Sequence, residues 1–101
     1  MQTVTSEDFD KEVTESKVPV ICDFSATWCG PCRSLKPVMQ DLDATSDGKY
    51  KVVLVDIDES QDLASRFGIS AVPTTIIIKS GVEVHRHLGV GRKDEFLDMV
   101  K

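Results

Sequence analysis

The sequence contains few cysteines, fewer basic than acidic residues, and no long apolar run. Three cysteines in 101 residues are too few, and odd in number, for the disulfide framework of a small secreted domain. The net charge is −5 and no basic cluster occurs, so electrostatics do not favour binding to nucleic acid. No apolar stretch is long enough to cross a bilayer, and we expect no membrane association.

The first residues also lack the apolar core of a secretory signal peptide, since the run from Met1 to Asp8 is mostly polar. We therefore expect a protein of a reducing compartment, which is the cytoplasm or, alternatively, an organelle matrix after removal of a targeting segment. The length and the 41% share of hydrophobic residues suit one core. We expect a single domain over residues 1–101 that is monomeric.

Against this background, two of the cysteines stand close together in the run Ala-Thr-Trp-Cys-Gly-Pro-Cys-Arg, residues 26–33. The run follows a strand-like segment and opens a helix-like one. Residues three apart share a helix face, so the sulfurs of Cys29 and Cys32 can meet. Cys29 lies where free backbone N–H groups and the helix dipole stabilise negative charge. Because a thiolate is the attacking species in disulfide exchange, the spacing predicts a reversible dithiol/disulfide pair.

Apolar periodicity and turn residues divide the chain into alternating strands and helices. The expected elements are a short strand over 2–4, a helix near 6–15, a strand over 18–24, a helix after the cysteines, a strand over 52–57, a helix over 60–67, strands over 72–79 and 82–87, and a helix over 92–101. This order predicts an α/β fold in which a parallel β-α-β unit is extended by an antiparallel hairpin.

Further motifs extend the cysteine run. The segment from Asp23 to Cys32 is joined in order and spacing by Pro37, by Val-Pro-Thr at 72–74, by Gly81 in the hairpin turn, and by Gly89 before the last helix. On these residues the whole chain resembles the thioredoxin family. The resemblance implies a thioredoxin fold, which is a central mixed β-sheet flanked by helices on both faces.

The same resemblance implies an activity. A thioredoxin is a protein-disulfide reductase, a thiol–disulfide oxidoreductase that maintains cellular thiol redox balance. Cys29 would be the attacking thiolate and Cys32 the buried resolving thiol. No cofactor would be bound; NADPH would supply electrons through a thioredoxin reductase. The expected partners are that reductase and disulfide-containing substrate proteins.

The resemblance also implies which residues support the site. Pro73 would follow a cis peptide bond and lie beside the cysteines, and Asp23 would be a buried carboxylate beneath Cys32. The residues expected to support the site are Trp28, Gly30, Pro31 and Pro73, and those expected to line the substrate surface are Trp28, Gly30, Val72, Gly89 and Val90.

Asp23 within an apolar strand admits two interpretations. It could lie at an exposed strand end, or be buried near the thiols as a proton acceptor, and the cost of burying a carboxylate favours a function. Bacterial-type thioredoxins often carry a lysine in the second central strand near this carboxylate. The matching residue here is Leu54, so burial should raise the pKa of Asp23 without opposition from a cation.

Other residues have simpler interpretations. A zinc site would need four ligands, and the only further candidates, Cys22, His85 and His87, do not suit one, so we expect no metal. Cys22 is expected to be a small core residue that points away from Asp23. The two histidines and the charged run 92–95 are expected at the surface.

Three rival functions fit a cysteine pair of this spacing. An oxidase or isomerase usually carries a histidine between the cysteines, whereas Gly30-Pro31 matches the reducing branch. A binding module recognised only in its reduced state is also compatible with the sequence. A glutathione-dependent glutaredoxin agrees less well with Trp28 and Gly30-Pro31.

Overall fold

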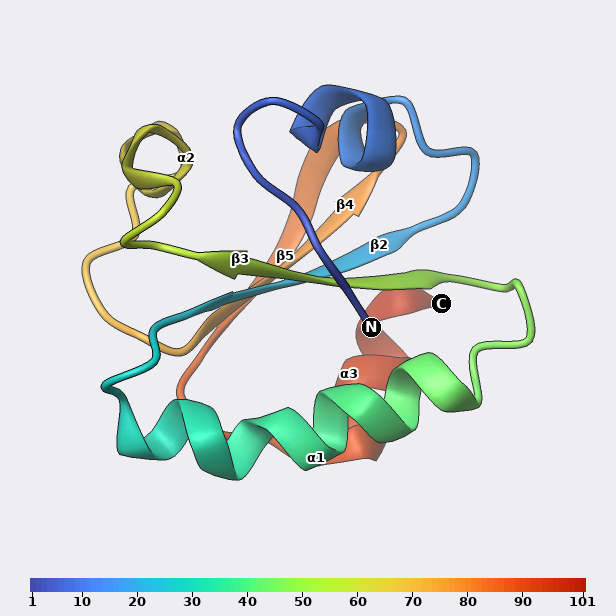
Figure 1. Cartoon of the computed structure of the whole chain (residues 1–101). Helices are drawn as coiled ribbons and strands as arrows, with labels where there is room; N and C mark the ends of the chain where they lie inside the picture. The colour runs from blue at the N-terminus through green and yellow to red at the C-terminus, as the bar shows by residue number, and fades with distance from the viewer.

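The computed structural model describes residues 1–101 and contains a five-stranded mixed sheet with helices on both faces (Figure 1). The strands are β1 (Gln2–Thr3), β2 (Val20–Ser25), β3 (Lys51–Asp56), β4 (Thr74–Lys79) and β5 (Val82–Leu88). Their order in the sheet is β1-β3-β2-β4-β5; β3 pairs in parallel with β1 and β2, and β4 is antiparallel to β2 and β5. The expected α/β class is confirmed.

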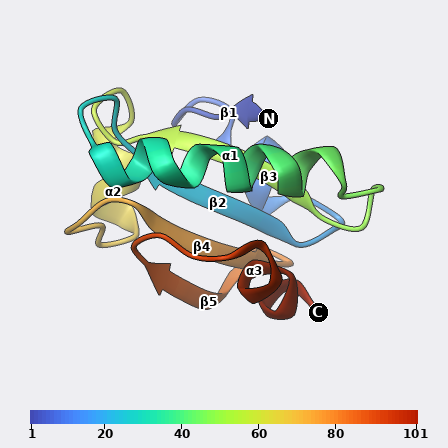
Figure 2. The ribbon, with the colours of Figure 1, turned by 90° about the horizontal axis from the view of Figure 1, so that it is seen from below.

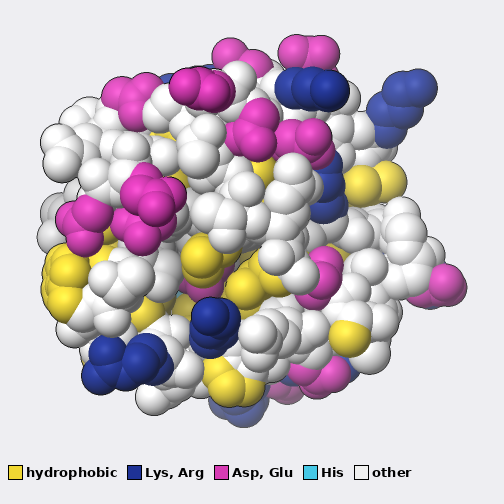
Figure 3. Space-filling view, in the orientation of Figure 1, with side chains coloured by type: hydrophobic (Ala, Val, Ile, Leu, Met, Phe, Trp, Pro, Cys, Tyr) yellow, Lys and Arg dark blue, Asp and Glu magenta, His cyan; other side chains and the backbone are white.

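Four helical segments cover the sheet. They are η1 (Asp10–Thr14), α1 (Gly30–Ala44), α2 (Gln61–Arg66) and α3 (Lys93–Val100). The helices α1 and α3 lie side by side on one face, and η1 and α2 lie on the other (Figures 1 and 2). None of these helices combines the length and apolar character needed to cross a bilayer. On the face drawn in Figure 3, acidic and basic side chains are interspersed and form no broad basic surface.

The first helical segment is shorter and wider than the helix expected near 6–15. The Asp8 carboxylate accepts the Thr5 backbone N–H at 2.7 Å and closes a turn first. The Glu15 N–H then bonds to the carbonyl of Asp10, five residues back, which gives η1 its π-helical form. Phe9 nevertheless packs in the core. The apolar spacing therefore identified the buried face correctly but not the type of helix.

The central strand β2 is buried on both faces because β3 and β4 flank it and helices cover both sides. Cys22 and Phe24 belong to the core under η1 and α2, whereas Ile21 belongs to the core under α1 and α3. Alternation along the strand places Asp23 on the α1 side. Cys22 therefore points away from Asp23, as expected, and is fully buried.

The long helix α1 continues through Pro37 and packs on the sheet with an apolar stripe formed by Leu35, Met39 and Leu42, all fully buried. These side chains meet Ile77 of β4 and Phe96 of α3 in one cluster. The stripe therefore fixes the orientation of α1 over β2, with the start of the helix at the end of that strand.

The hairpin of β4 and β5 forms at the expected Ser80-Gly81 turn, where both residues have positive φ, 52° and 80°. The strand β5 is the edge of the sheet. Val82, Val84 and Leu88 are all exposed, and the β4–β5 register shifts between Ile77 and Ile78. No helix packs over these apolar side chains, so the alternation of apolar and polar residues along β5 does not correspond to a buried face.

Cys22 offers a direct check of this packing. Burial, with a smaller effect of the neighbouring Asp23, raises the pKa of the Cys22 thiol, so the group should be protonated and unreactive. The oxidised protein should show no thiol that reacts with a chromogenic reagent when folded and one thiol in denaturant. Cys22→Ser should lower the free energy of unfolding by about 1 to 3 kcal/mol, because a hydroxyl replaces an apolar contact. A reactive thiol in the folded, oxidised protein would contradict the burial.

Candidate active site

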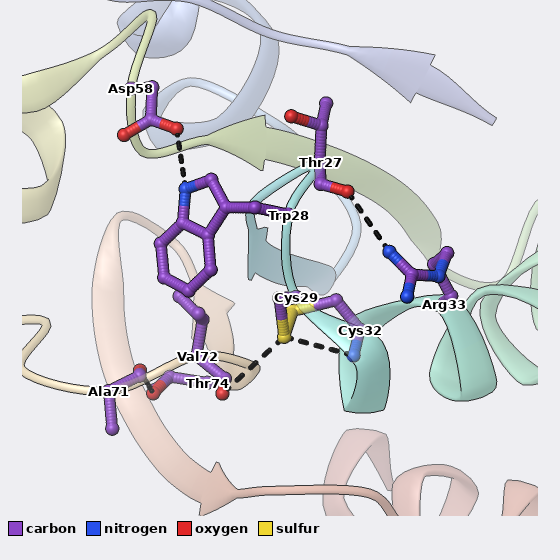
Figure 4. Close-up of a disulfide and its surroundings, with 9 residues drawn as sticks. All are labelled: Thr27, Trp28, Cys29, Cys32, Arg33, Asp58, Ala71, Val72 and Thr74. Atoms are coloured by element: carbon purple, nitrogen blue, oxygen red, sulfur yellow. Dashed lines mark hydrogen bonds between the residues drawn. A yellow bond between two sulfur atoms is a disulfide. The ribbon is translucent and has the colours of Figure 1, made fainter.

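The two cysteines lie at the N-terminus of α1, where β2 ends. Cys29 is the N-cap residue in an extended conformation, and its Sγ accepts the backbone N–H of Cys32 at 3.1 Å. Pro31, in the first turn, has no N–H that would need a partner there. The sulfurs form a disulfide between Cα atoms 5.2 Å apart (Figure 4). The expected pair is therefore present, with Cys29 in the position where a helix stabilises a thiolate.

The two sulfurs differ in their surroundings. Cys32 is 2% exposed and faces inward from the first turn of α1. Cys29 is 5% exposed and lies at the N-terminal end of the helix. Cys29 Sγ lies 3.7 Å from the carbonyl oxygen of Val72, on the segment before β4 (Figure 4). The loop before β4 therefore borders Cys29 directly.

That neighbouring segment contains the expected cis bond, between Val72 and Pro73. Pro73 is buried and Val72 is half-buried against the cysteines. The carbonyl of Pro73 accepts the N–H of Gly89 at 2.9 Å, and Gly89 has a φ of +83°, which suits glycine. The loop after β5 is thereby joined to the segment beside Cys29.

Trp28 lies beside the cysteines and is 65% exposed, so it is not a core residue. Its indole N–H donates to the carboxylate of Asp58 at 2.9 Å, which fixes the ring over the loop that follows β3 (Figure 4). Asp58 is held in turn, because its backbone N–H donates to Asp56 Oδ1 at 2.8 Å. Sequence reasoning missed Asp58, although the parallel pairing of β2 and β3 brings the loops after both strands to the same edge.

Asp23 is 1% exposed, and neither carboxylate oxygen has a hydrogen-bond partner. Its register neighbours are Leu54 on β3 and Thr75 on β4, and the Thr75 hydroxyl is also unpaired. Burial raises the pKa of Asp23 to about 7. The interpretation as an exposed strand end is therefore wrong. The position of Leu54 is confirmed, and no cation approaches the carboxylate from β3.

A cavity of about 250 Å³ connects Asp23 with Cys32. Leu54 forms part of its wall, and the exposed side chains of Arg33 and Lys36, both from α1, also line it. Since a water molecule occupies roughly 30 Å³ of liquid, the cavity has room for several. The arrangement gives the buried carboxylate and the inner sulfur a common, solvent-accessible space, and its cations come from the helix rather than from the sheet.

The remaining expected residues surround Cys29 at the surface. Gly30 and Pro31 are exposed at the first turn of α1, and Val90 is 50% exposed in the loop that Gly89 begins. Sequence reasoning did not single out Leu88, which is 68% exposed just before Gly89. The site thus combines two buried sulfurs with exposed apolar groups that could receive an extended polypeptide.

The chain is similar to known proteins over most of its length. The family model described as thioredoxin matches residues 1–101. A thioredoxin of Rickettsia felis is 39% identical over 97 residues, which cover 96% of this chain and 92% of the relative. Thioredoxin 1 of a Nostoc species is 45% identical over 86 residues, 85% of this chain and 80% of the relative. A mitochondrial thioredoxin of Mus musculus is 40% identical over 94 residues, which cover 93% of this chain and 57% of the relative.

The raised pKa of Asp23 predicts how stability depends on pH. In the unfolded chain this pKa is about 3.9, and in the folded protein it is about 7. The stability contributed by the extra bound proton is complete below the unfolded pKa and is lost as pH rises through the folded one. Between pH 5 and pH 8 the loss should be roughly 3 kcal/mol.

Denaturant titrations at both pH values check this expectation. Asp23→Ala should gain stability relative to the wild type at pH 8 and gain less at pH 5, because the ionisation cost is absent. Asp23→Asn, which keeps the size of the side chain without its charge, should show the same flattened pH dependence. A variant that retained the wild-type slope would assign the pH dependence to other groups.

Proposed function

The chain belongs to the thioredoxin family, and from that premise we propose how its residues divide the work of disulfide reduction. It is a thiol–disulfide oxidoreductase whose redox centre is the Cys29–Cys32 pair. In the proposal Cys29 is the attacking thiolate and Cys32 the resolving thiol. The observation that carries this assignment is the position of Cys29 Sγ at the helix N-terminus, where it accepts the Cys32 N–H.

Two exchange steps complete the reaction. The Cys29 thiolate attacks one sulfur of a substrate disulfide, which breaks the substrate bond, forms a mixed disulfide and releases the first substrate thiolate. Cys32 then loses its proton and attacks Cys29 Sγ, which forms the Cys29–Cys32 disulfide and releases the second substrate thiolate. Two electrons pass from the chain to the substrate.

Asp23 would accept the proton that Cys32 loses in the second step. Both groups line the same cavity, whose size allows a water molecule to carry the proton between them. A base with a pKa of about 7 is half-deprotonated at neutral pH, where it can both take and release a proton. Neither carboxylate oxygen accepts a hydrogen bond from the protein, which supports this role because both remain free to accept a proton.

The substrate would bind across the surface around Cys29. The carbonyl of Val72 could pair with an extended substrate strand, and the exposed side chains of Trp28 and Val90 would flank it. Gly30 and Gly89 leave room for a close approach of the substrate backbone. Pro31 and Pro73 would support the site by shaping the first turn of α1 and the segment beside Cys29.

Electrons would reach the oxidised pair from NADPH through a thioredoxin reductase, as the resemblance to other thioredoxins suggests. The substrates would be disulfide-containing proteins of a reducing compartment, the cytoplasm or an organelle matrix, and the monomer would help to maintain thiol redox balance there. A low reduction potential of the pair would support reductase over oxidase function, because the potential sets the direction of electron flow.

Cysteine variants test the assignment of roles. With NADPH, a thioredoxin reductase and a disulfide-bonded protein, the wild type should sustain NADPH consumption, and Cys29→Ser should abolish it. Cys32→Ser should accumulate a mixed disulfide through Cys29, because the resolving thiol is missing. Cys22→Val, which removes the third thiol, should stay active as the matched control. Faster alkylation of Cys32 than of Cys29 in the reduced protein would reverse the two roles.

The pH profile of the resolving step tests Asp23 as the base. Asp23→Ala should slow this step at pH 7, as measured by the decay of a preformed mixed disulfide. Leu54→Lys would place a cation on β3 beside Asp23, lower its pKa, and move the midpoint of the profile to lower pH. Leu54→Met is the neutral control and should leave the midpoint in place.

Carbon NMR of the Asp23 carboxyl measures its pKa directly, independently of the rate of the resolving step. A lowered pKa with an unchanged rate profile would show that Asp23 is not the base for Cys32.

A further inference from the structure

His87, near the end of β5, is not the solvated residue that its sequence context suggested. It is half-buried, and its Nε2 lies 3.1 Å from the carbonyl oxygen of Val90. A carbonyl only accepts hydrogen bonds, so the proton is on Nε2 and the imidazole donates. The ring also packs edge-on against Phe96 of α3, with centroids 5.2 Å apart and an interplanar angle of 76°. Phe96 is fully buried, which anchors the imidazole to the core.

The chain passes directly over this pair of rings at Gly91. A Cβ atom there would lie 2.8 Å from His87 Nε2 and 2.8 Å from Phe96 Cζ, which is closer than real contacts allow. Gly91 does not have a positive φ, so its backbone conformation does not require glycine. The requirement comes from the close packing of the loop backbone on His87 and Phe96.

The loop over 89–91 is therefore held at both ends and in the middle. The N–H of Gly89 donates to the carbonyl of Pro73, and the carbonyl of Val90 accepts from His87. Gly91 packs on the rings of His87 and Phe96. While its carbonyl is bonded to His87, Val90 keeps its side chain 50% exposed. We propose that His87 is a positioning residue that orients this loop for recognition of protein substrates.

This inference rests on the proposed function, in which Gly89 and Val90 contribute to the substrate surface. Loss of the His87 hydrogen bond would free the Val90 carbonyl to turn and leave the loop in several conformations. Binding of a protein substrate that contacts the loop should then weaken by about three- to ten-fold, the range that one neutral hydrogen bond supports. The reaction of Cys29 with a small disulfide should not change, because a small disulfide has no need of the loop.

Three variants separate the hydrogen bond from other effects. His87→Leu removes the donor and keeps apolar contact with Phe96. His87→Gln places an amide N–H near the position of Nε2 and should restore binding. His85→Leu is the matched control, because His85 is exposed on the same strand and takes part in none of these contacts.

The readouts are KM and kcat for a disulfide-bonded protein and the rate with a small aryl disulfide. His87→Leu should raise KM about three- to ten-fold, with kcat and the small-disulfide rate unchanged. His87→Gln and His85→Leu should behave as the wild type. An unchanged KM in His87→Leu, or a raised KM that His87→Gln does not restore, would overturn the inference.

Two further variants keep the result interpretable. If His87→Leu does not fold, Gly91→Ala tests the same packing in the presence of His87, and it should also raise KM; an unchanged KM would overturn the inference. Val90→Asp tests the loop itself. An unchanged KM in Val90→Asp would disprove the proposed role of the loop in substrate binding. A raised KM in Val90→Asp together with an unchanged KM in His87→Leu would disprove only the role of His87.

Discussion

The structure depends on one junction, the point where the buried strand β2 ends and α1 begins. A helix N-terminus presents unpaired N–H groups and a partial positive charge, and Cys29 caps it with a sulfur. The sheet gives this junction a fixed position, because β2 pairs with β3 and β4 and is buried on both faces. The apolar stripe of α1 then sets the direction of the helix, so that Cys32 turns inward and Cys29 remains at the tip.

Around this junction, segments distant in the chain meet at one edge. The loop after β3 brings Asp58 to the indole of Trp28, and the segment before β4 brings Val72 to Cys29 (Figure 4). The loop after β5 joins them through Gly89. Each of these contacts uses a backbone or surface group, and together they form the border of the redox centre.

At Asp23 the requirements of the site and of fold stability are opposite, because a buried carboxylate can accept a proton but lowers the stability of the fold when it is charged. Burial next to Leu54 and Thr75, without a hydrogen bond or a cation from the sheet, disfavours the charged carboxylate and raises its pKa. A core residue chosen for stability alone would be apolar at this position. The solvent-accessible cavity beside it likewise takes the place of close packing between α1 and the sheet, which would otherwise add dispersion contacts.

Local sequence patterns were sufficient to predict the order of elements, the cysteine pair at a strand–helix junction and the opposite orientations of Cys22 and Asp23. These are properties of local periodicity and capping, which act over a few residues. Three features became visible only in the folded molecule: the pairing of Trp28 with Asp58, the exposure of apolar side chains on β5 and the packing of half-buried His87 against Phe96. Such contacts depend on which distant segments meet and on what covers an edge strand, and no local pattern encodes either.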